Sequence, residues 1–305
     1  MERNVENKSE KTPSLTIITP TFNRERTLKS CYDSVAAQTC RNFQWIIIDD
    51  GSTDNTPELI EELKKDGAVE FEYYTKENGG KHTALNASHK YIKGKFVTVL
   101  DSDDTLLPDA VETILNEWKK YENENGVNVL YFYKCDKTGN PLCYVKHPNV
   151  ITKTYKVRRL SNVNSRDCCD VFKTEAFIKY PFPVFPDERF IGEGAAHMNI
   201  ELSGKGVYID KAVYECEYLP DGLTMAGRKL RINNPLGGKY NANIYMNRRL
   251  PLFTRLKYSL LYNCYSAFAS ISLKDSLKTS DYPVLALLGF LPGRLLYFYW
   301  ERKYK

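Results

Sequence analysis

The sequence predicts an α/β protein in which helices flank a mostly parallel central sheet. Short apolar segments and longer amphipathic segments alternate four times within about 110 residues near the N-terminus. This alternation is typical of parallel strands joined by helical crossovers. The apolar segments are almost unbroken, as in strands that are covered on both faces. A basic segment rich in aromatic residues ends the chain, and we expect it to form a helical extension.

Four strands, each followed by a helix, are predicted in the first part of the chain. The strands fall at residues 15–19, 43–48, 69–73 and 96–100, and the helices at 26–38, 56–67, 84–92 and 108–118. The second helix is the most clearly delimited. Thr56 can cap its N-terminus, Pro57 suits its first position, and Gly67 can end it.

The pattern changes after Gly126. The elements predicted there are, in order, a hairpin with strands at 128–133 and 142–146, a short helix beginning at 170–175, a helix ending near Gly204, an extended segment at 207–218 and helices from Leu250 onward.

Three of the predicted strands end in polar residues. These ends are TPTFN at 19–23, DDGS at 49–52 and DSDD at 101–104. In open α/β sheets, ligands bind outside the carboxyl ends of the strands. Because the predicted topology brings the three ends together, they indicate one shared ligand site.

The acidic sequence at 101–104 indicates the chemistry of that site. Neighbouring carboxylates repel one another, and a buried carboxylate is costly without a partner. A divalent cation takes oxygen ligands, relieves both costs and can bridge to phosphate. The alternative is a polar turn that precedes the helix at Pro108. The two other polar strand ends favour a metal site and a phosphorylated ligand.

Two common phosphate-binding loops are absent from the sequence. The first strand is followed by TPTFNRERT and not by a G-x-G-x-x-G turn, and no G-x-x-x-x-G-K-[ST] sequence occurs. These absences argue against a dinucleotide-binding fold of the usual kind.

The polar segments resemble the motifs of glycosyltransferase family 2, whose members have the GT-A fold. The matching sequences are ITPTFN at 18–23, IDDGSTD at 48–54, NGGKHTALN at 78–86 and DSDD at 101–104. YLPDGLT at 218–224 resembles a bacterial polysaccharide-synthesis subgroup. The resemblance covers residues 13–218. It implies a metal-dependent, inverting transfer of a sugar from a nucleoside diphosphate to a hydroxyl of a saccharide, which we expect to be lipid-linked.

The resemblance also implies roles for single residues. The donor would be bound by Pro20, Thr21, Asn23, Asp50, Gly79, Gly80, Lys81, Asp101 and Ser102, and Mn²⁺ or Mg²⁺ by Asp103 and Asp104. The Asp50 carboxylate would accept a hydrogen bond from the N3–H group of uracil, which cytosine lacks, so a UDP-sugar is favoured. Gly79 and Gly80 would let the backbone approach the nucleotide.

The catalytic base that the resemblance implies is Glu193, in the sequence IGEG at 191–194. A carboxylate within reach of the acceptor hydroxyl must take its proton during attack. Family members often have Glu-Asp at this place, and Gly194 departs from that pattern. Asp187 and Glu188 are the nearest substitutes.

Four segments follow from these observations. They are a disordered tail at 1–12, a nucleotide-sugar-binding half at 13–125, an acceptor-binding and catalytic half at 126–220, and a basic, aromatic helical region at 221–305. After residue 221 there are 14 Lys and Arg against three acids, a net charge of +11, which leaves −6 for the first 221 residues.

The C-terminal region has the composition of a membrane-associating segment. Its apolar run is interrupted at Pro292-Gly293-Arg294, so we do not expect it to span a bilayer. Aromatic residues beside Lys and Arg suit the lipid–water interface, and the basic charge suits anionic lipid or the phosphates of a polyprenyl carrier. The alternative is an amphipathic region that packs on the core or forms a dimer.

The cysteines and the N-terminal residues indicate where the protein is located in the cell. Eight irregularly spaced cysteines without a C-x-x-C pair favour a reduced cytosolic setting. The first dozen residues lack the apolar stretch of a secretion signal. We therefore expect a peripheral protein on the cytoplasmic face of the inner membrane.

Two other functions are possible for this sequence. One is that of a nucleotidyltransferase, which would usually have a Gly-rich phosphate loop. The other is a non-catalytic, membrane-binding protein, which would not need three acids at one strand end. Nucleic acid is disfavoured because the nucleotide-facing half is acidic.

Overall fold

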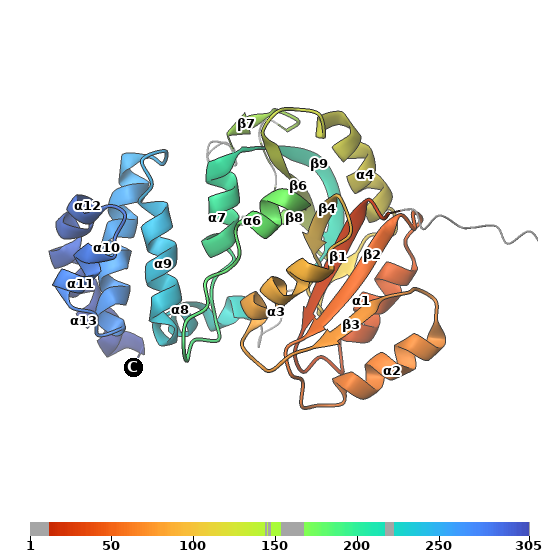
Figure 1. The fold of residues 1–305 in the computed structure, drawn as a ribbon, viewed down its shortest axis with the longest axis horizontal. Helices are drawn as coiled ribbons and strands as arrows, with labels where there is room; N and C mark the ends of the chain where they lie inside the picture. Colours follow the sequence, from red (N-terminus) through yellow and green to blue (C-terminus); the bar gives the residue numbers. More distant parts are fainter. Residues whose placement is uncertain (1–11, 144, 146–147, 154–167, 217–222, 305) are drawn as a thin grey trace, which may run out of the picture.

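A nine-stranded sheet lies at the centre of the computed structural model (Figure 1). The structure describes residues 12–143, 145, 148–153, 168–216 and 223–304. Within these residues the strand order is β3-β2-β1-β4-β8-β6-β9-β5, and β7 pairs with β9. The predicted tail at 1–12, apart from its last residue, lies outside the described residues. So do parts of the predicted strand at 142–146 and of the motif at 218–224.

The first four strands confirm the predicted parallel arrangement. They are β1 (Leu15–Thr21), β2 (Phe43–Asp49), β3 (Glu72–Thr75) and β4 (Phe96–Val99). β1 lies between β2 and β4, and all of these pairings are parallel. Ile17 and Ile18 belong to the cores on opposite faces of the sheet, which explains why the strand is apolar throughout. β3 begins three residues later than predicted.

The remaining strands make the sheet mixed. They are β5 (Thr105–Leu106), β6 (Val127–Cys135), β7 (Thr152–Lys153), β8 (Cys168–Lys173) and β9 (Lys205–Glu215). β8 runs antiparallel to both β4 and β6, whereas β9 runs parallel to β6. β5 and β7 pair with β9 in antiparallel fashion. The parallel arrangement is therefore concentrated in the first half of the sheet.

The prediction that a helix begins at 170–175 is wrong for its first four residues. These residues belong to β8, and α6 (Thr174–Lys179) begins only at Thr174. Val171 and Phe172 are buried in different cores, as adjacent residues of a central strand must be. The first strand of the predicted hairpin, 128–133, lies within β6, and among the described residues one bridge, between Cys135 and Pro141, marks the predicted turn.

Helices cover both faces of the sheet. α1 (Leu28–Ala36), α2 (Thr56–Asp66) and α4 (Ala110–Tyr121) contribute to one core, and α3 (Lys81–Ser88), α6 and α7 (Gly194–Ser203) contribute to the other. In the first core, Trp118 of α4 stacks on Phe96 of β4 with ring centroids 4.3 Å apart. Such a pair stabilises the fold by about 0.5–1.5 kcal/mol beyond the area it buries.

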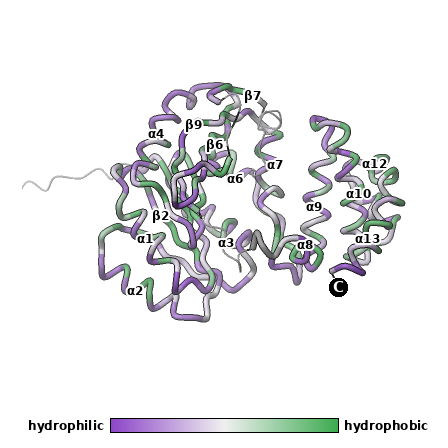
Figure 2. Tube along the Cα trace, turned by 180° about the vertical axis from the view of Figure 1, so that it is seen from behind, coloured by the Kyte–Doolittle hydropathy of each residue, from purple (hydrophilic) through white to green (hydrophobic). Residues whose placement is uncertain are grey.

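The predicted helical C-terminal region is confirmed and lies beside the sheet (Figure 1). Its helices are α8 (Leu223–Asn233), α9 (Pro235–Tyr245), α10 (Leu252–Phe268), α11 (Leu273–Lys278), α12 (Pro283–Leu288) and α13 (Phe290–Tyr304). Met198 and Leu202 of α7 pack with Ile244 of α9 and with Leu250, so this contact attaches the region to the sheet domain. Polar and apolar residues are interspersed along these helices (Figure 2). None of the described helices is long and apolar enough to cross a bilayer.

Candidate active site

The carboxyl ends of the parallel strands lie side by side, as the predicted topology requires. Thr21, at the end of β1, is in register with Asp49, at the end of β2. Pro20 and Thr21 are buried. Among the described residues, the Thr21 hydroxyl has no hydrogen-bond partner, so a buried, unpaired polar group stands at the end of β1.

Asn23 connects the loops that follow β1 and β2. Its backbone N–H donates to the Ser52 hydroxyl (2.9 Å), and its side-chain oxygen accepts from the Thr53 N–H (2.8 Å). Asn23 has a positive φ of 53°, which Asn tolerates better than most residues. The structure thus gives this predicted donor residue a positioning role within the site.

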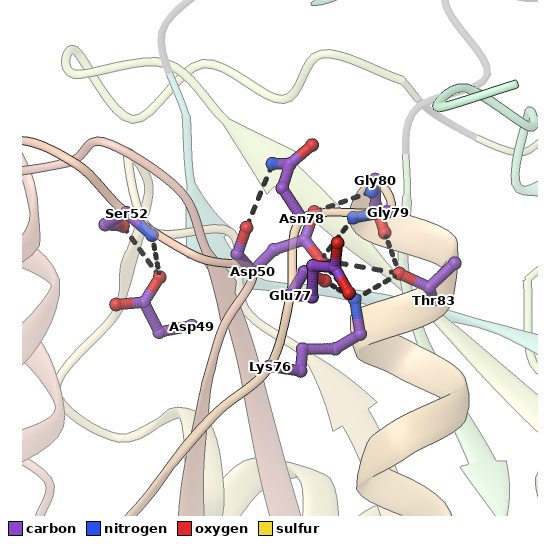
Figure 3. Close-up of polar contacts among 9 residues, drawn as sticks. All are labelled: Asp49, Asp50, Ser52, Lys76, Glu77, Asn78, Gly79, Gly80 and Thr83. Atoms are coloured by element: carbon purple, nitrogen blue, oxygen red, sulfur yellow. Dashed lines mark hydrogen bonds and ion pairs between the residues drawn. The ribbon is translucent and has the colours of Figure 1, made fainter. Parts of the chain in front are cut away.

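Asp50 organises the glycine loop that precedes α3 (Figure 3). Its carboxylate is 3% exposed and accepts the backbone N–H groups of Gly79 (3.0 Å) and Gly80 (2.6 Å). The Lys76 ammonium neutralises it at 2.6 Å, and the Asn78 amide donates to the Asp50 carbonyl at 2.9 Å. Charge-assisted bonds to backbone N–H groups are among the stronger ones in proteins, so they fix the loop against the end of β2. The predicted contact of Asp50 with a base stays a prediction.

Gly80 brings the glycine loop against the loop that contains Arg189, in the second half of the sheet domain. Its φ is +94°, and a side-chain carbon at this position would lie 1.9 Å from the carbonyl oxygen of Arg189. Only a residue without a side chain fits such an approach. The two halves of the chain therefore meet backbone to backbone at this point.

Lys81, the first residue of α3, joins the same two halves through charge. Its ammonium lies 2.5 Å from a carboxylate oxygen of Asp101 and 2.7 Å from one of Glu193. The Lys81 side chain is 26% exposed and that of Glu193 is 52% exposed, so both can be reached from solvent. Three sequence-predicted site residues thus form one contiguous group.

The pKa values in this group follow from its ion pairs. Burial acts to lower the pKa of Lys81, but the charges of Asp101 and Glu193 outweigh it and raise that pKa above its ordinary value. The Lys81 charge holds the pKa of Glu193 well below its usual range, against the effect of burial, with a further contribution from His197. Glu193 is therefore ionised at neutral pH, which is the state that can accept a proton.

The three carboxylates of the 101–104 turn have three separate partners. They are Lys81 for Asp101 (2.5 Å), Arg24 for Asp103 (3.8 Å) and the Tyr214 hydroxyl for Asp104 (2.9 Å). Tyr214 also accepts the backbone N–H of Asp101 at 3.0 Å, so it holds both ends of the turn. Ser102, in the same turn, is only 4% exposed.

The chemistry of this turn fits a cation that shares its coordination with a ligand. Burial raises the pKa of Asp104 to about 7, and Asp101 and Asp103 add to this effect, against the charge of Lys134 and the hydrogen bond from Tyr214. A cation beside Asp104 would favour its ionised form. In the part of the chain that the structure describes, no group of three or more His, Cys, Asp or Glu side chains could hold a metal. An ion here would complete its shell with phosphate and water, as Mg²⁺ commonly does.

The geometry distinguishes Glu193 from its predicted substitutes. Both carboxylate oxygens of Glu188 accept backbone N–H groups at the start of α9, from Leu236 (2.5 Å) and Gly237 (2.7 Å). Glu188 is thus a helix cap. Asp187 is exposed. A side-chain carbon at position 194 would lie 3.2 Å from the Tyr245 hydroxyl, so a larger residue after Glu193 would require this tyrosine of α9 to shift by a few tenths of an ångström.

Comparison with known proteins decides the family. The model of glycosyl transferase family 2 matches residues 16–180. The chain belongs to glycosyl transferase family 2. It is therefore a glycosyltransferase, and its fold is the GT-A fold that the sequence motifs predict.

Two sequence relatives illustrate how far the similarity extends. The glycosyltransferase GlyG of Streptococcus pneumoniae is 26% identical over 213 residues, which are 66% of this chain and 69% of GlyG. The chondroitin synthase of Pasteurella multocida is 40% identical over 108 residues, which are 35% of this chain but only 11% of the synthase. The similarity to the synthase therefore covers a small part of that protein.

Two solved structures share the fold of this family 2 member. Residues 1–349 of S. aureus TarS, in complex with UDP-GlcNAc, have a TM-score of 0.60 and 18% identity, over 88% of this chain and 76% of that TarS fragment. The mannosyltransferase PcManGT from Pyrobaculum calidifontis, in complex with GDP-Man and Mn²⁺, has a TM-score of 0.57 and 18% identity, over 97% of this chain and 84% of PcManGT.

Several site residues of this glycosyltransferase were missed by sequence reasoning. They are Lys76, which neutralises Asp50, Tyr214, which holds the 101–104 turn, and His197 with Asp170. His197 lies one helical turn after Glu193, and its ring nitrogen is 3.3 Å from the Asp170 carboxylate. Lys76 stands just before a recognised motif and could have been suspected. Tyr214 is 113 residues from Asp101, and no local pattern marks it.

Proposed function

We propose that this enzyme transfers a sugar from a UDP-sugar to a hydroxyl of a saccharide, with inversion and with the aid of a divalent metal ion. The observation that carries the proposal is the Lys81 ammonium, which contacts Asp101 at the donor edge of the sheet and Glu193 on the acceptor side. An acid at the donor edge and an acid that can serve as a base thus lie on either side of one lysine. The nucleotide-sugars bound in TarS and PcManGT support a donor of this class.

In this proposal one half of the chain binds the donor and the other half binds the acceptor. Residues 13–125 bind the nucleotide-sugar, with the Asp50-organised glycine loop and the buried Thr21 facing the nucleoside. Residues 126–220 bind the acceptor and supply the base. The close contact between Gly80 and the Arg189 carbonyl fixes the position of the two halves relative to each other.

Asp103 and Asp104 are the residues that we propose to hold the ion. Asp103 has the loosest contact of the three acids, 3.8 Å to Arg24, and Asp104 follows it in the same turn. When bound, Mn²⁺ or Mg²⁺ would neutralise charge on the departing diphosphate. Arg24 pairs with Asp103, and Lys81 pairs with Asp101 of the same turn; in this proposal both cations orient the same phosphates.

Glu193 takes the proton of the acceptor hydroxyl. Its ion pair with Lys81 keeps it ionised before the acceptor arrives. When donor phosphates bind the Lys81 ammonium, the ion pair between Lys81 and Glu193 weakens. The pKa of Glu193 then rises, and Glu193 becomes a stronger base. Attack from the side of Glu193, opposite the leaving diphosphate, inverts the anomeric carbon.

We further propose that the acceptor is carried on a polyprenyl phosphate in bacterial surface polysaccharide synthesis, and that the enzyme sits on the cytoplasmic face of the inner membrane. Leu291, Leu295 and Phe298 of α13 are 72%, 71% and 56% exposed. Their spacing places them on one face of the helix. The neighbouring helix α12 also exposes apolar residues, namely Val284, Leu287 and Leu288. Basic residues of α13 suit an anionic membrane surface.

Glu193→Gln should abolish transfer and leave donor binding intact. The amide keeps the shape of the side chain but cannot accept the proton, so kcat should fall by at least about 100-fold. Turnover with acceptor and calorimetric binding of the UDP-sugar would both be measured. Asp187→Asn is the matched control, because Asp187 is an exposed acid of the same loop. Near-wild-type turnover of Glu193→Gln would show that another group is the base.

Asp103→Ala should remove the metal dependence of donor binding. Without this carboxylate the ion loses a protein ligand, and UDP should bind equally weakly with and without Mn²⁺ in a calorimetric titration. Asp33→Ala removes an exposed acid of α1 whose one ion pair within the described residues is with Lys29, and it should bind UDP as the wild type does. Undiminished Mn²⁺-dependent binding by Asp103→Ala would contradict the metal assignment.

The double substitution Leu291→Gln and Leu295→Gln should release the enzyme from anionic vesicles. Membrane partitioning should fall by more than about tenfold, because burial of each leucine contributes roughly 1.5–3 kcal/mol. Flotation with phosphatidylglycerol vesicles at low and high salt measures this. Ile178→Gln with Val184→Gln, two exposed apolar residues of the acceptor half, is the control. No salt-sensitive binding by the wild type, or a dimer that dissociates in the variant, would contradict a membrane role.

A further inference from the structure

A cavity of about 590 Å³ opens between the Glu193 loop and the C-terminal helices. Gly192, Glu193 and Gly194 line one side of it, and residues of α8, α9, α10 and α13 line the rest. These helices stand next to α7 at the side of the sheet domain (Figure 1). The candidate base therefore lies on the wall of a space that the helical extension encloses. A cavity of this size suits a ligand of a few hundred daltons.

The charged residues that line the cavity are mostly basic. Arg228, Arg231 and Lys257 line the cavity, and Glu193 is the one acid among the lining residues. Within the described residues, none of these three cations forms an ion pair with a carboxylate. Arg228 is held over the Trp300 ring, 4.3 Å from its centroid, whereas Lys257 lies farther from the Tyr258 ring, at 5.8 Å. Arg231 and Lys257 are therefore the cations less closely held by a ring, and an anion entering the cavity would meet them.

Two polar atoms in the lining also lack partners. Trp300 is 4% exposed, and neither its ring N–H nor the side-chain oxygen of Asn241 has a hydrogen-bond partner among the described residues. An unmade hydrogen bond at a buried group costs roughly 1–3 kcal/mol. Both atoms are closed to solvent in this structure, so the contacts that the lining offers a ligand come from its cations and its exposed ring faces. The aromatic rings of the lining, Trp300 among them, offer apolar faces for a sugar ring.

We infer that this cavity binds the acceptor through a phosphate group, with Arg231 and Lys257 as the phosphate-binding residues and the reactive hydroxyl toward Glu193. The inference rests on the proposed function and adds the place and the residues that bind the phosphate of the acceptor, a glycosyl phosphate or phosphodiester. Such a phosphate has two sources. It can be the head of a lipid carrier, or it can belong to a soluble sugar phosphate or polymer. The cavity chemistry is the same for both.

The test is calorimetric binding of phosphate-bearing probes while UDP and Mn²⁺ occupy the donor site. Wild-type enzyme should bind glucose 1-phosphate or farnesyl phosphate, and glucose at least tenfold more weakly. Arg231→Gln with Lys257→Gln should weaken phosphate binding by at least about tenfold, because a hydrogen bond to a charged group contributes about 1.5–3 kcal/mol. Arg248→Gln with Lys274→Gln removes the same charge from exposed positions of the same region and should have no effect.

The outcomes decide both the inference and the source of the phosphate. Tighter binding of farnesyl phosphate would assign the phosphate to a lipid carrier, and tighter binding of glucose 1-phosphate to a soluble or polymeric acceptor. Failure of both probes to bind, equal binding of glucose, or equal affinity in the two double variants would overturn the inference. The proposed function fails separately, if the wild type does not bind UDP with Mn²⁺.

The fluorescence emission of Trp300 can show whether a bound probe lies in the cavity. The other two tryptophans, Trp45 and Trp118, are buried in the sheet core, so a ligand in the cavity should change the emission of Trp300. This change should disappear in Trp300→Phe. A probe that binds without changing the emission would lie elsewhere and would overturn the assignment.

Discussion

The ion pairs of Lys81 are the interaction on which the whole site depends. This lysine joins Asp101, at the end of β4, to Glu193, which is 112 residues away from it in the sequence. Its neighbour Gly80 packs against the Arg189 backbone, so contact and charge fix the same junction. Because one ammonium serves both acids, the donor edge and the acceptor loop cannot separate without leaving two carboxylates unneutralised.

The charge of the chain changes sign beyond this junction, after residue 221. The first 221 residues carry a net charge of −6 and the remainder +11. Acids at the strand ends are suited to a cation and its bound diphosphate, whereas Arg231 and Lys257 in the cavity are suited to an anion. Glu193 lies between the two regions. In the proposed function, the donor would therefore bind at the strand ends and the acceptor in the cavity, with Glu193 between them.

The sequence predicted what depends on local order and missed what depends on distant contacts. The four βα units and the polar strand ends follow from apolar runs and their boundaries, and Glu193 follows from its resemblance to a family motif. The β8 strand was partly mistaken for a helix start, because its pairing with β4 and β6 is not visible locally. The capping role of Glu188 requires α9, which is 49 residues away at Gly237. Tyr214 acts on the acidic turn through tertiary contact alone.

The most direct test of the account is a panel of nucleotide-sugars assayed with Mn²⁺ or Mg²⁺, with and without a lipid-linked saccharide acceptor. The readout is the released nucleotide product. The account predicts release of UDP from one or more UDP-sugars, dependent on the metal and stimulated by the acceptor. Release of pyrophosphate from a nucleoside triphosphate and a sugar phosphate, with no turnover of any nucleotide-sugar, would contradict it.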